Sequence, residues 1–499
     1  MRLPRFAPAL LILLGALRIA ATWNTFSATA DEGMHVVAGL QVLDKGRYDQ
    51  HLVNPPLPRV LSAIGPYLAG ARFDADSTIV PQAASIFHAT RNYKTILTLA
   101  RASTVLFFIL AAWATYAWTR REFDELTAVV ALLLFTTQPA ILGHSGLATL
   151  DIAGVAGLAV GLLAFSRWLE APTKRNAAIL GVAYGFAIAC KLLCIVYVPV
   201  ACIAIYIVRG LRDRWRPITT TPIVAITAAF TLWAGYGFSI GRDAWVGVTF
   251  PIPAPAFFHG LVDVVQGNEE GLLAYALGHV SQTGWWWYFP FALALKTTLG
   301  VLLLLAIGVI ARDKRFLEPL AATFAILAFS TTTHVHIGVR YILPVLVPLC
   351  VAAAAAFTIA LDRKLLVRRL AGALLAWHLL ASAMAHPDYV AYFNEIAVRN
   401  PSWFLVDSNL DWGQDLLRLR DEVRRERIAA LGVNVFFGEA MNDLGFPPLT
   451  HIDANTPTSG WIAVSEGSYR VNRVYGGFGW LRGKPYRRIG KSIRLYHVR

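Results

Sequence analysis

The chain is poor in charged residues. Only 15% of its 499 residues are Asp, Glu, Lys or Arg, whereas 56% are hydrophobic and the mean hydropathy is +0.52. Soluble domains carry about one quarter charged residues. The composition therefore excludes a soluble enzyme and predicts a protein that crosses a membrane many times.

Cysteine is also scarce. The four cysteines are Cys190, Cys194, Cys202 and Cys350, and all of them fall within hydrophobic runs. No disulfide is expected in the loops, and the spacing of Cys190 and Cys194 is typical of neither a zinc site nor a redox motif. The sequence also lacks a Gly-rich phosphate loop after a strand, a repeat of fixed period and any low-complexity segment. Nothing in it indicates a nucleotide site.

Long hydrophobic runs are abundant. Eleven of them could cross the roughly 30 Å hydrocarbon core of a bilayer, allowing for short or tilted helices. The predicted spans are 6–23, 95–118, 125–141, 151–168, 177–190, 193–208, 219–240, 289–310, 317–332, 339–361 and 370–386. Two short runs, 177–190 and 193–208, meet at Lys191 and could form one broken hairpin instead.

The net charge of +14 is concentrated on one side of these spans. Six short segments carry eighteen Lys and Arg against eight Asp and Glu: 1–5, 119–125, 167–175, 209–216, 311–318 and 362–369. The short connections on the other side, 142–150 and 333–338, have no Lys or Arg. This pattern predicts the N-terminus inside and the C-terminus outside. The basic excess thus indicates topology and not a nucleic-acid partner.

The N-terminus also resembles a signal peptide, because Arg2 and Arg5 precede an apolar run that ends near Ala28-Thr29-Ala30. Cleavage there would leave an even number of spans and break the alternation of charge. We therefore expect the first span to be retained, and Asp31 faces outside under either interpretation.

Three segments outside the spans are long enough to fold. Residues 24–94 contain helical patterns at 32–44 and 57–70, which suit helices lying in the membrane interface. Residues 241–288 end in the aromatic run Trp285–Tyr288, expected as an interfacial belt, with stacking on a sugar or contact with a lipid tail as the alternative. Residues 387–499 are predicted to form a small α/β domain after a transmembrane domain of 1–386. Its expected elements are strands at 404–407, 433–437, 461–464 and 492–497 and a helix at 415–427.

Polar residues gather where the topology places the outer surface. They are Asp31, Glu32, Asp151, Lys191, Lys296 and Arg340. Singly, each has an ordinary explanation: a Lys or Arg extends to the head groups, and Asp151 caps the helix that it begins. Together they combine carboxylates with cations at one level of the membrane, which favours a functional site.

This set fits one definite reaction. If a sugar is carried on a polyprenyl phosphate, cations must stabilise the phosphate as it departs. A carboxylate must take the proton from the acceptor hydroxyl on the opposite face of the sugar. Phosphate is already a good leaving group, so neither a metal nor a nucleotide is required.

Several motifs resemble a known family. The acidic pair after the first span, Asn54–Leu57 (NPPL) and Leu147–Asp151 (LATLD) are similar to protein mannosyltransferases and aminoarabinose transferases, which share the GT-C fold. The runs Gly284–Lys296, Gly338–Pro344 and Asp407–Leu416 resemble a bacterial branch of carrier-lipid-dependent transferases. The resemblance covers most of the chain.

The resemblance implies roles for the site residues. Asp31 would be the catalytic base, with Glu32 and Asp151 shaping the acceptor side, in an inverting transfer. The carrier phosphate would be held by Lys191, Lys296 and Arg340.

One departure concerns metal. Aminoarabinose transferases have a metal-ligating Glu two residues before the Pro-Pro, and this chain has Val53 there. His51 is nearby without an obvious partner. Hydrogen-bonding roles at the interface are expected for His334 and His336, with metal ligation as the alternative. We therefore expect no metal and no other cofactor.

The segment Asp407–Asp415 admits two interpretations. Asn409, Asp411 and Trp412 could bind the acceptor or its sugar, since aromatic faces stack on sugars and carboxylates and amides take their hydroxyls. Alternatively the segment is a turn before a helix, in which Asp411 is the cap, Gly413 permits the bend and Trp412 packs against the membrane domain.

The sequence thus predicts a hexosyl- or pentosyltransferase of the bacterial cytoplasmic membrane, with its site facing outside. Its expected partners are a polyprenyl-phosphate sugar, the bilayer and an acceptor glycan, lipid or protein. The sugar is left open. A transporter or lipid-linked sugar flippase is the main alternative, because charges and a broken span also fit transport. A receptor or scaffold acting through the tail is the third.

Overall fold

We describe a computed structural model of the chain, covering residues 4, 6–76, 78–88, 92–213, 219–243, 245–311 and 313–499. Parts of the basic segments that predict the topology, including Arg2, Arg5, Arg214, Arg216 and Arg312, lie outside the described residues.

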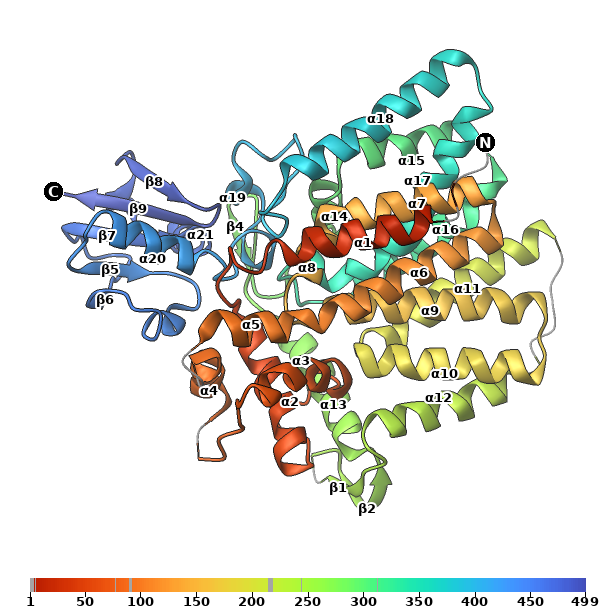
Figure 1. Cartoon of the computed structure of the whole chain (residues 1–499), viewed down its shortest axis with the longest axis horizontal. Coiled ribbons are helices and arrows are strands. Elements are labelled where there is room, and N and C mark those ends of the chain that lie inside the picture. Colours follow the sequence, from red (N-terminus) through yellow and green to blue (C-terminus); the bar gives the residue numbers. More distant parts are fainter. Residues whose placement is uncertain are drawn as a thin grey trace.

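A bundle of long helices makes up most of the molecule (Figure 1). In chain order these are α1 (Ala7–Ala20), α5 (Tyr93–Ala102), α6 (Thr104–Glu122), α7 (Glu125–Thr137), α8 (Pro139–Ser145), α9 (Asp151–Glu170), α10 (Lys174–Cys190), α11 (Cys194–Arg212), α12 (Thr221–Gly235), α14 (Tyr288–Lys296), α15 (Leu299–Ala311), η2 (Lys314–Phe316), α16 (Leu317–Ser330), η3 (Val339–Val345), α17 (Leu346–Leu361) and α18 (Leu365–Met384). The N-terminus and the C-terminal sheet lie at opposite ends of the bundle (Figure 1).

Every predicted hydrophobic run lies on one of these helices or on two consecutive ones. Within the described residues, five helices are long and apolar enough to cross a membrane, or up to seven if each of two bent pairs forms one span, and α1, α12 and α16 are shorter apolar helices. The chain is therefore a multi-pass membrane protein, and the count of eleven spans stays a prediction.

The helices α9 and α17 form the centre of the bundle. In each, 89% of the most apolar window is buried, as expected for helices that are hydrophobic on all sides. Small residues let the neighbours approach closely: a Cβ on Gly157 would lie 2.7 Å from the Cα of Ala187 in α10. Such close approach is how helices pack in membranes, where hydrophobicity alone does not hold them together.

Two of the predicted spans are broken. The helices α7 and α8 bend by 59° at Pro139, which the missing N–H of proline explains. The helices α14 and α15 bend by 112°, so the prediction of one continuous span at 289–310 is wrong. At this break, Asn394 donates to the carbonyls of Ala294 and Thr297, which satisfies backbone oxygens that a continuous helix would have bonded.

The first large loop folds into α2 (Ala30–Lys45), α3 (Pro56–Leu68), α4 (Ile79–Ser85) and η1 (Ile86–His88). The two helices predicted at 32–44 and 57–70 are present as α2 and α3. However, α2 does not present one apolar face to an interface, because all its residues from Val36 to Gln41 are buried. Glycines make this possible: Gly39 passes directly over the backbone of Arg59 in α3.

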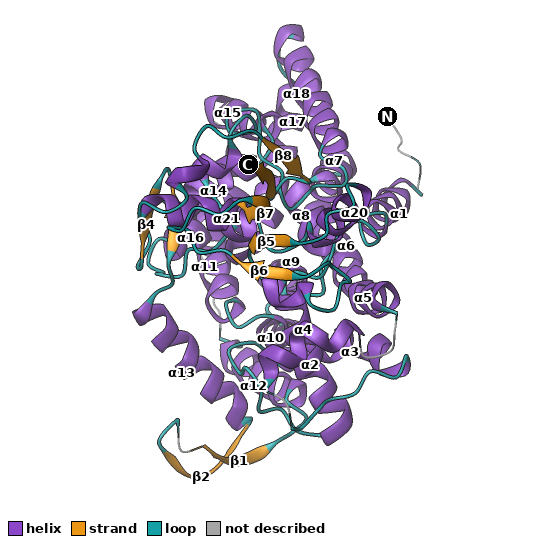
Figure 2. Cartoon of the chain, turned by 90° about the vertical axis from the view of Figure 1, so that its left-hand side faces the viewer, coloured by secondary structure: helices purple, strands orange, loops and turns teal. Residues whose placement is uncertain are grey.

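The second large loop contains β1 (Ile240–Asp243), β2 (Val248–Pro253), α13 (Pro255–Glu270), β3 (Ala274–Ala276) and β4 (His279–Ser281). The strands form two separate antiparallel pairs. Figure 2, seen from the end that carries the C-terminal sheet, shows α2–α4 and α13 below that sheet.

The tail contains α19 (Pro401–Phe404), η4 (Asp407–Asn409), α20 (Leu416–Arg425), β5 (Leu431–Asn434), η5 (Gly438–Met441), β6 (Leu449–His451), β7 (Gly460–Ser465), α21 (Glu466–Val474), η6 (Gly479–Leu481), β8 (Tyr486–Ile489) and β9 (Ile493–Val498). The five strands form one mixed sheet in the order β6-β5-β7-β9-β8. Strands β5, β6 and β7 are parallel, and β9 runs antiparallel to β7 and β8.

The predicted strands at 461–464 and 492–497 and the helix at 415–427 are present, and the strand expected at 433–437 covers Leu431–Asn434. The strand predicted at 404–407 is wrong. There Leu405 makes a single bridge to Ala276, and Asp407 adopts a positive φ of 55° that ends any extension.

Candidate active site

Asp31 lies where three parts of the chain meet. It is in the first turn of α2, and its Oδ2 accepts a hydrogen bond from Nη1 of Arg340 in η3 at 2.5 Å. The guanidinium of Arg340 also lies 4.2 Å from the centre of the Trp412 ring in the tail. The Asp31 side chain remains 22% exposed, so a ligand can reach this ion pair.

A second ion pair adjoins the first. Nζ of Lys191 donates to Oδ1 of Asp151 at 2.7 Å and to the backbone oxygen of Arg340 at 3.2 Å. Lys191 follows the last residue of α10, and it can lie against α9 because Gly154 has no side chain there. The four predicted residues Asp31, Asp151, Lys191 and Arg340 therefore form one group.

Glu32 lies outside this group. Neighbouring residues of a helix point about 100° apart, and Glu32 points into the protein, where it pairs with Arg101 at 2.8 Å with neither side chain exposed. Its oxygens also accept the backbone N–H groups of Thr29 and Ala148. This arrangement fits a residue that fixes the start of α2 and does not fit one that shapes the acceptor side.

Lys296 also lies outside the group formed by Asp31, Asp151, Lys191 and Arg340. It is the last residue of α14, 2% exposed, and its Nζ donates to the carbonyls of Val390 at 2.7 Å and Asn409 at 2.6 Å. The prediction that it binds the carrier phosphate does not fit this geometry. Lys296 instead holds the tail against the helices.

Residues of the tail segment hold Arg340 and the adjacent backbone in place. Oδ1 of Asn409 accepts the backbone N–H of Val339 at 3.0 Å, and its Nδ2 donates to the Tyr288 hydroxyl at 3.0 Å. Trp412 is buried under the guanidinium. Asn409 and Trp412 thus position Arg340, and this agrees with the packing role for Trp412 better than with sugar stacking.

Asp411 faces the C-terminal sheet domain and does not cap α20, the helix that follows it in the chain. Its Oδ2 accepts the backbone N–H of Gly467 at the start of α21, at 2.8 Å. The helix α20 begins later, at Leu416. Gly413 has the positive φ of 85° expected for the bend.

Comparisons with known proteins extend this picture. Residues 94–235 match the sequence model of the family described as dolichyl-phosphate-mannose-protein mannosyltransferase. The crystal structure of ArnT from Cupriavidus metallidurans bound to undecaprenyl phosphate aligns over 99% of this chain and 98% of that chain, with 13% identity and a TM-score of 0.53. The same protein in the apo state aligns over 98% and 97%, with 12% identity and a TM-score of 0.51. At this identity the structural match shows a common fold. The chain thus shares the ArnT fold, and its residues 94–235 resemble the protein-mannosyltransferase family.

The oligosaccharyltransferase of Archaeoglobus fulgidus in its apo form is a more distant structural likeness. It has 16% identity, a TM-score of 0.44 and coverage of 91% of this chain and 62% of that chain. No functionally curated protein matches the sequence.

The sequence motifs gave no individual role to two residues that lie beside the candidate site, Asp407 and His35. Asp407 has a positive φ and lies close enough to Arg340 and Asp31 to be affected by both charges, and burial raises its pKa to about 6. His35 follows Asp31 by four residues on α2, a spacing that places two side chains on one face of a helix. That spacing was visible in the sequence.

The expectation that no metal is bound stays a prediction. Val53 has no ligand atom, and the described residues contain no group of three or more His, Cys, Asp or Glu placed to hold a metal ion. His334 bonds the backbone oxygen of Asn268 through Nδ1 at 3.0 Å. His336 packs between the rings of Tyr288 and Phe289.

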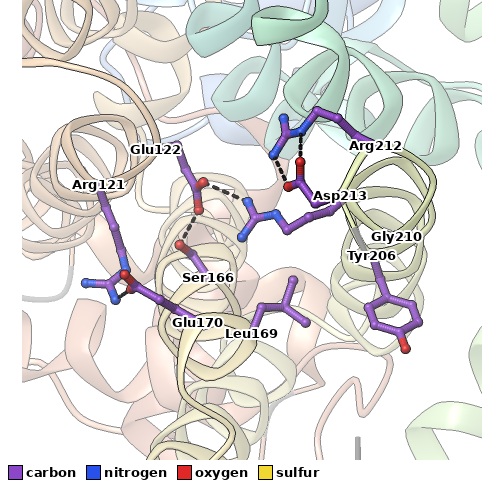
Figure 3. A pocket seen from close by; sticks show the side chains of 10 residues that line it. Arg121, Glu122, Ser166, Leu169, Glu170, Tyr206, Gly210, Arg212 and Asp213 are labelled. Carbon is purple, nitrogen blue, oxygen red and sulfur yellow. Dashed lines mark hydrogen bonds and ion pairs between the residues drawn. The ribbon is translucent and has the colours of Figure 1, made fainter. Parts of the chain in front are cut away.

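A cavity of about 280 Å³ is lined by residues of α6, α9 and α11 (Figure 3). Glu122, which lines it, bonds Ser166 and Arg209 and so ties α6, α9 and α11 together. The lining residue Glu170 ends α9, whereas Asp151 begins it, and a helix of this length separates them by about 30 Å. The cavity is thus remote from the group around Asp31.

We expect the pH dependence of the protein's stability to include a contribution from Asp411. Burial raises the pKa of this carboxyl from 3.8 to about 7. Between these values the folded state holds a proton that the unfolded state has lost, so this contribution to stability is present at low pH and is lost as pH rises towards 7. Asp411→Asn, which is neutral throughout, should lack this dependence.

The measurement is the melting temperature in detergent from about pH 5 to about pH 8, reported as wild type minus variant. This difference should fall as pH rises. Asp421→Asn, at a largely exposed carboxylate, is the control and should give a flat difference. An equally flat difference for Asp411→Asn would contradict the prediction.

Proposed function

We propose that the protein transfers a sugar from a polyprenyl-phosphate donor to an acceptor hydroxyl at the outer face of the bacterial cytoplasmic membrane, with inversion at the anomeric carbon. The observation that supports this most is the partly exposed Asp31 carboxylate in contact with Arg340, beside the Asp151–Lys191 pair. ArnT, whose fold the chain shares, has been crystallised with undecaprenyl phosphate.

Arg340 and Lys191 bind the donor phosphate in this proposal. An arginine can offer two parallel N–H groups to phosphate oxygens, and a lysine adds a compact charge. Asp151 holds Lys191 in place through the 2.7 Å contact. The stacking of Arg340 on Trp412 fixes the plane of the guanidinium.

Asp31 is the general base. Its oxygen accepts the proton of the acceptor hydroxyl while that hydroxyl oxygen forms a bond to the anomeric carbon. The bond from that carbon to the phosphate oxygen breaks, and its electron pair leaves with the polyprenyl phosphate, whose charge Arg340 and Lys191 stabilise. No metal takes part in this proposal.

Donor binding prepares the base. Without a ligand, Oδ2 of Asp31 is occupied by Arg340. A phosphate that takes over Nη1 of Arg340 frees this oxygen for the acceptor proton. We therefore expect the donor to bind before the acceptor.

The experiment is a transfer assay on the purified full chain in lipid nanodiscs. A panel of polyprenyl-phosphate hexoses and pentoses is combined with glycan, lipid and peptide acceptors, and release of free polyprenyl phosphate is followed with and without a strong chelator. We expect acceptor-dependent release from one donor class, unchanged by the chelator. Movement of the intact sugar-lipid across a vesicle membrane without such release would indicate a flippase and overturn the proposal.

A further inference from the structure

Arg59 in α3 is a fully buried cation beside the site. Its Nε donates to Nδ1 of His35 at 3.1 Å, and its Nη2 lies 2.8 Å from Nδ1 of His51. Its Nη1 donates to the Tyr48 hydroxyl at 2.7 Å and to two backbone oxygens. Among the described residues it has no carboxylate partner.

These contacts fix the protons of both imidazoles. A guanidinium only donates hydrogen bonds, so each Nδ1 that it contacts must accept. Burial lowers the pKa of His51 to about 4 and that of His35 well below its ordinary value, and the charge of Arg59 lowers both further. Both rings are therefore neutral near pH 7, and each carries its single proton on Nε2.

His35 and His51 lie near the proposed reacting groups. His35 is one helical turn after Asp31 on the same face of α2. Asp151 and Arg340 are close enough to His35 to affect its pKa, and Asp31 affects that of His51. Neither Nε2 has a hydrogen-bond partner in the described part of the chain, and neither belongs to the side-chain atoms that are both buried and unpartnered. Both donors therefore lack a partner among the described residues, and they belong to an exposed residue, His51, and to a residue that is 4% exposed, His35.

The charges around them are unequal. Arg340 is balanced by Asp31 and Lys191 by Asp151, whereas Arg59 is unbalanced. A buried cation without a counter-ion is costly, and an anionic ligand nearby would offset that cost. Arg59 also cannot lose its proton, so its charge persists.

We propose that His35 and His51, held by Arg59, form a second anion-binding element that donates two N–H groups to the phosphate of the polyprenyl carrier. The inference rests on the proposed function, since it adds contacts to the same donor. Arg59 positions the two imidazoles. It also supplies a net positive charge, which the neutral ion pairs Asp31–Arg340 and Asp151–Lys191 do not. The phosphate then lies between Arg340 on η3 and this element, which consists of α2, α3 and the segment between them that carries His51.

The test measures binding of sugar-free undecaprenyl phosphate to the full chain in nanodiscs. His51→Phe keeps a ring at an exposed position and removes the donor, and His35→Phe does so within α2. A hydrogen bond to a charged group is worth about 1.5–3 kcal/mol, so each variant should weaken binding about 10- to 100-fold. His35→Gln, which retains an N–H near the position of Nε2, should restore much of the loss. His88→Phe is the matched control and should bind like wild type.

The outcomes separate the two proposals. If His51→Phe and His35→Phe bind the carrier like wild type while the assay above still detects transfer, this inference is wrong and the proposed function stands. A loss of affinity only for the sugar-bearing donor would also overturn it, because the element would then recognise the sugar. Wild-type protein that does not bind undecaprenyl phosphate would overturn both.

Discussion

Asp31→Asn is expected to lower turnover by about 100-fold or more, because positioned acid–base catalysis contributes roughly that factor. The amide keeps the shape of the carboxylate but cannot take the acceptor proton. Binding of the carrier phosphate should survive and become tighter, since Arg340 no longer shares its Nη1 with a carboxylate. The measurement pairs single-turnover sugar transfer with the Kd for undecaprenyl phosphate.

A fall in turnover without a loss of affinity for undecaprenyl phosphate distinguishes a general base from a structural residue. A structural role would lower both, together with the melting temperature. Asp44→Asn, at a carboxylate in the last turn of α2 that accepts the backbone N–H of Phe73, is the matched control and should leave turnover near normal. Near-normal turnover in Asp31→Asn would remove this residue from the mechanism.

The membrane helices could be predicted because hydrophobic length is a local property of the sequence. The positions of Asp31, Asp151, Lys191 and Arg340 followed from the same property, since each stands at the end of a run and the topology brings those ends together. The same criterion also selected Glu32 and Lys296, which the structure places outside the group.

Long-range backbone contacts could not be predicted in this way. Lys296 resembles an interfacial cation in sequence, but its partners are carbonyls contributed by Val390 and Asn409, about a hundred residues later. The break after Lys296 is hidden for the same reason, because the side chain that satisfies its free carbonyls is Asn394. Neither the charge pattern nor the hydropathy of the sequence predicts such partners.

The element around Arg59 is an intermediate case. A charged residue within the apolar pattern at 57–70 and a histidine four residues after Asp31 were both visible in the sequence. Their connection was not, because it depends on α2 and α3 passing closely at Gly39. The sequence pattern indicates which face of a helix carries functional residues. Which faces of two helices come into contact depends on tertiary packing.

The largest expected effect on stability concerns the ion pair of Glu32 and Arg101, neither of which is exposed. Arg101→Met should lower the free energy of unfolding by about 3–5 kcal/mol, because it leaves Glu32 charged, buried and unpaired. Arg101 also bonds three backbone oxygens just before α2, those of Trp23, Phe26 and Ser27. The start of the helix that carries Asp31 should therefore loosen as well.

The double variant Glu32→Gln/Arg101→Met identifies the cause. Glutamine can still accept the backbone N–H groups of Thr29 and Ala148, and no buried charge remains, so the double variant should be more stable than Arg101→Met alone. Chemical unfolding in mixed micelles gives the free energies, and Arg120→Met at the exposed pair with Glu125 should cost at most about 1 kcal/mol. If the double variant were no more stable than Arg101→Met, the cost would come from lost packing and backbone bonds, and Glu32 would act as a cap for α2 rather than as the counter-ion that Arg101 requires.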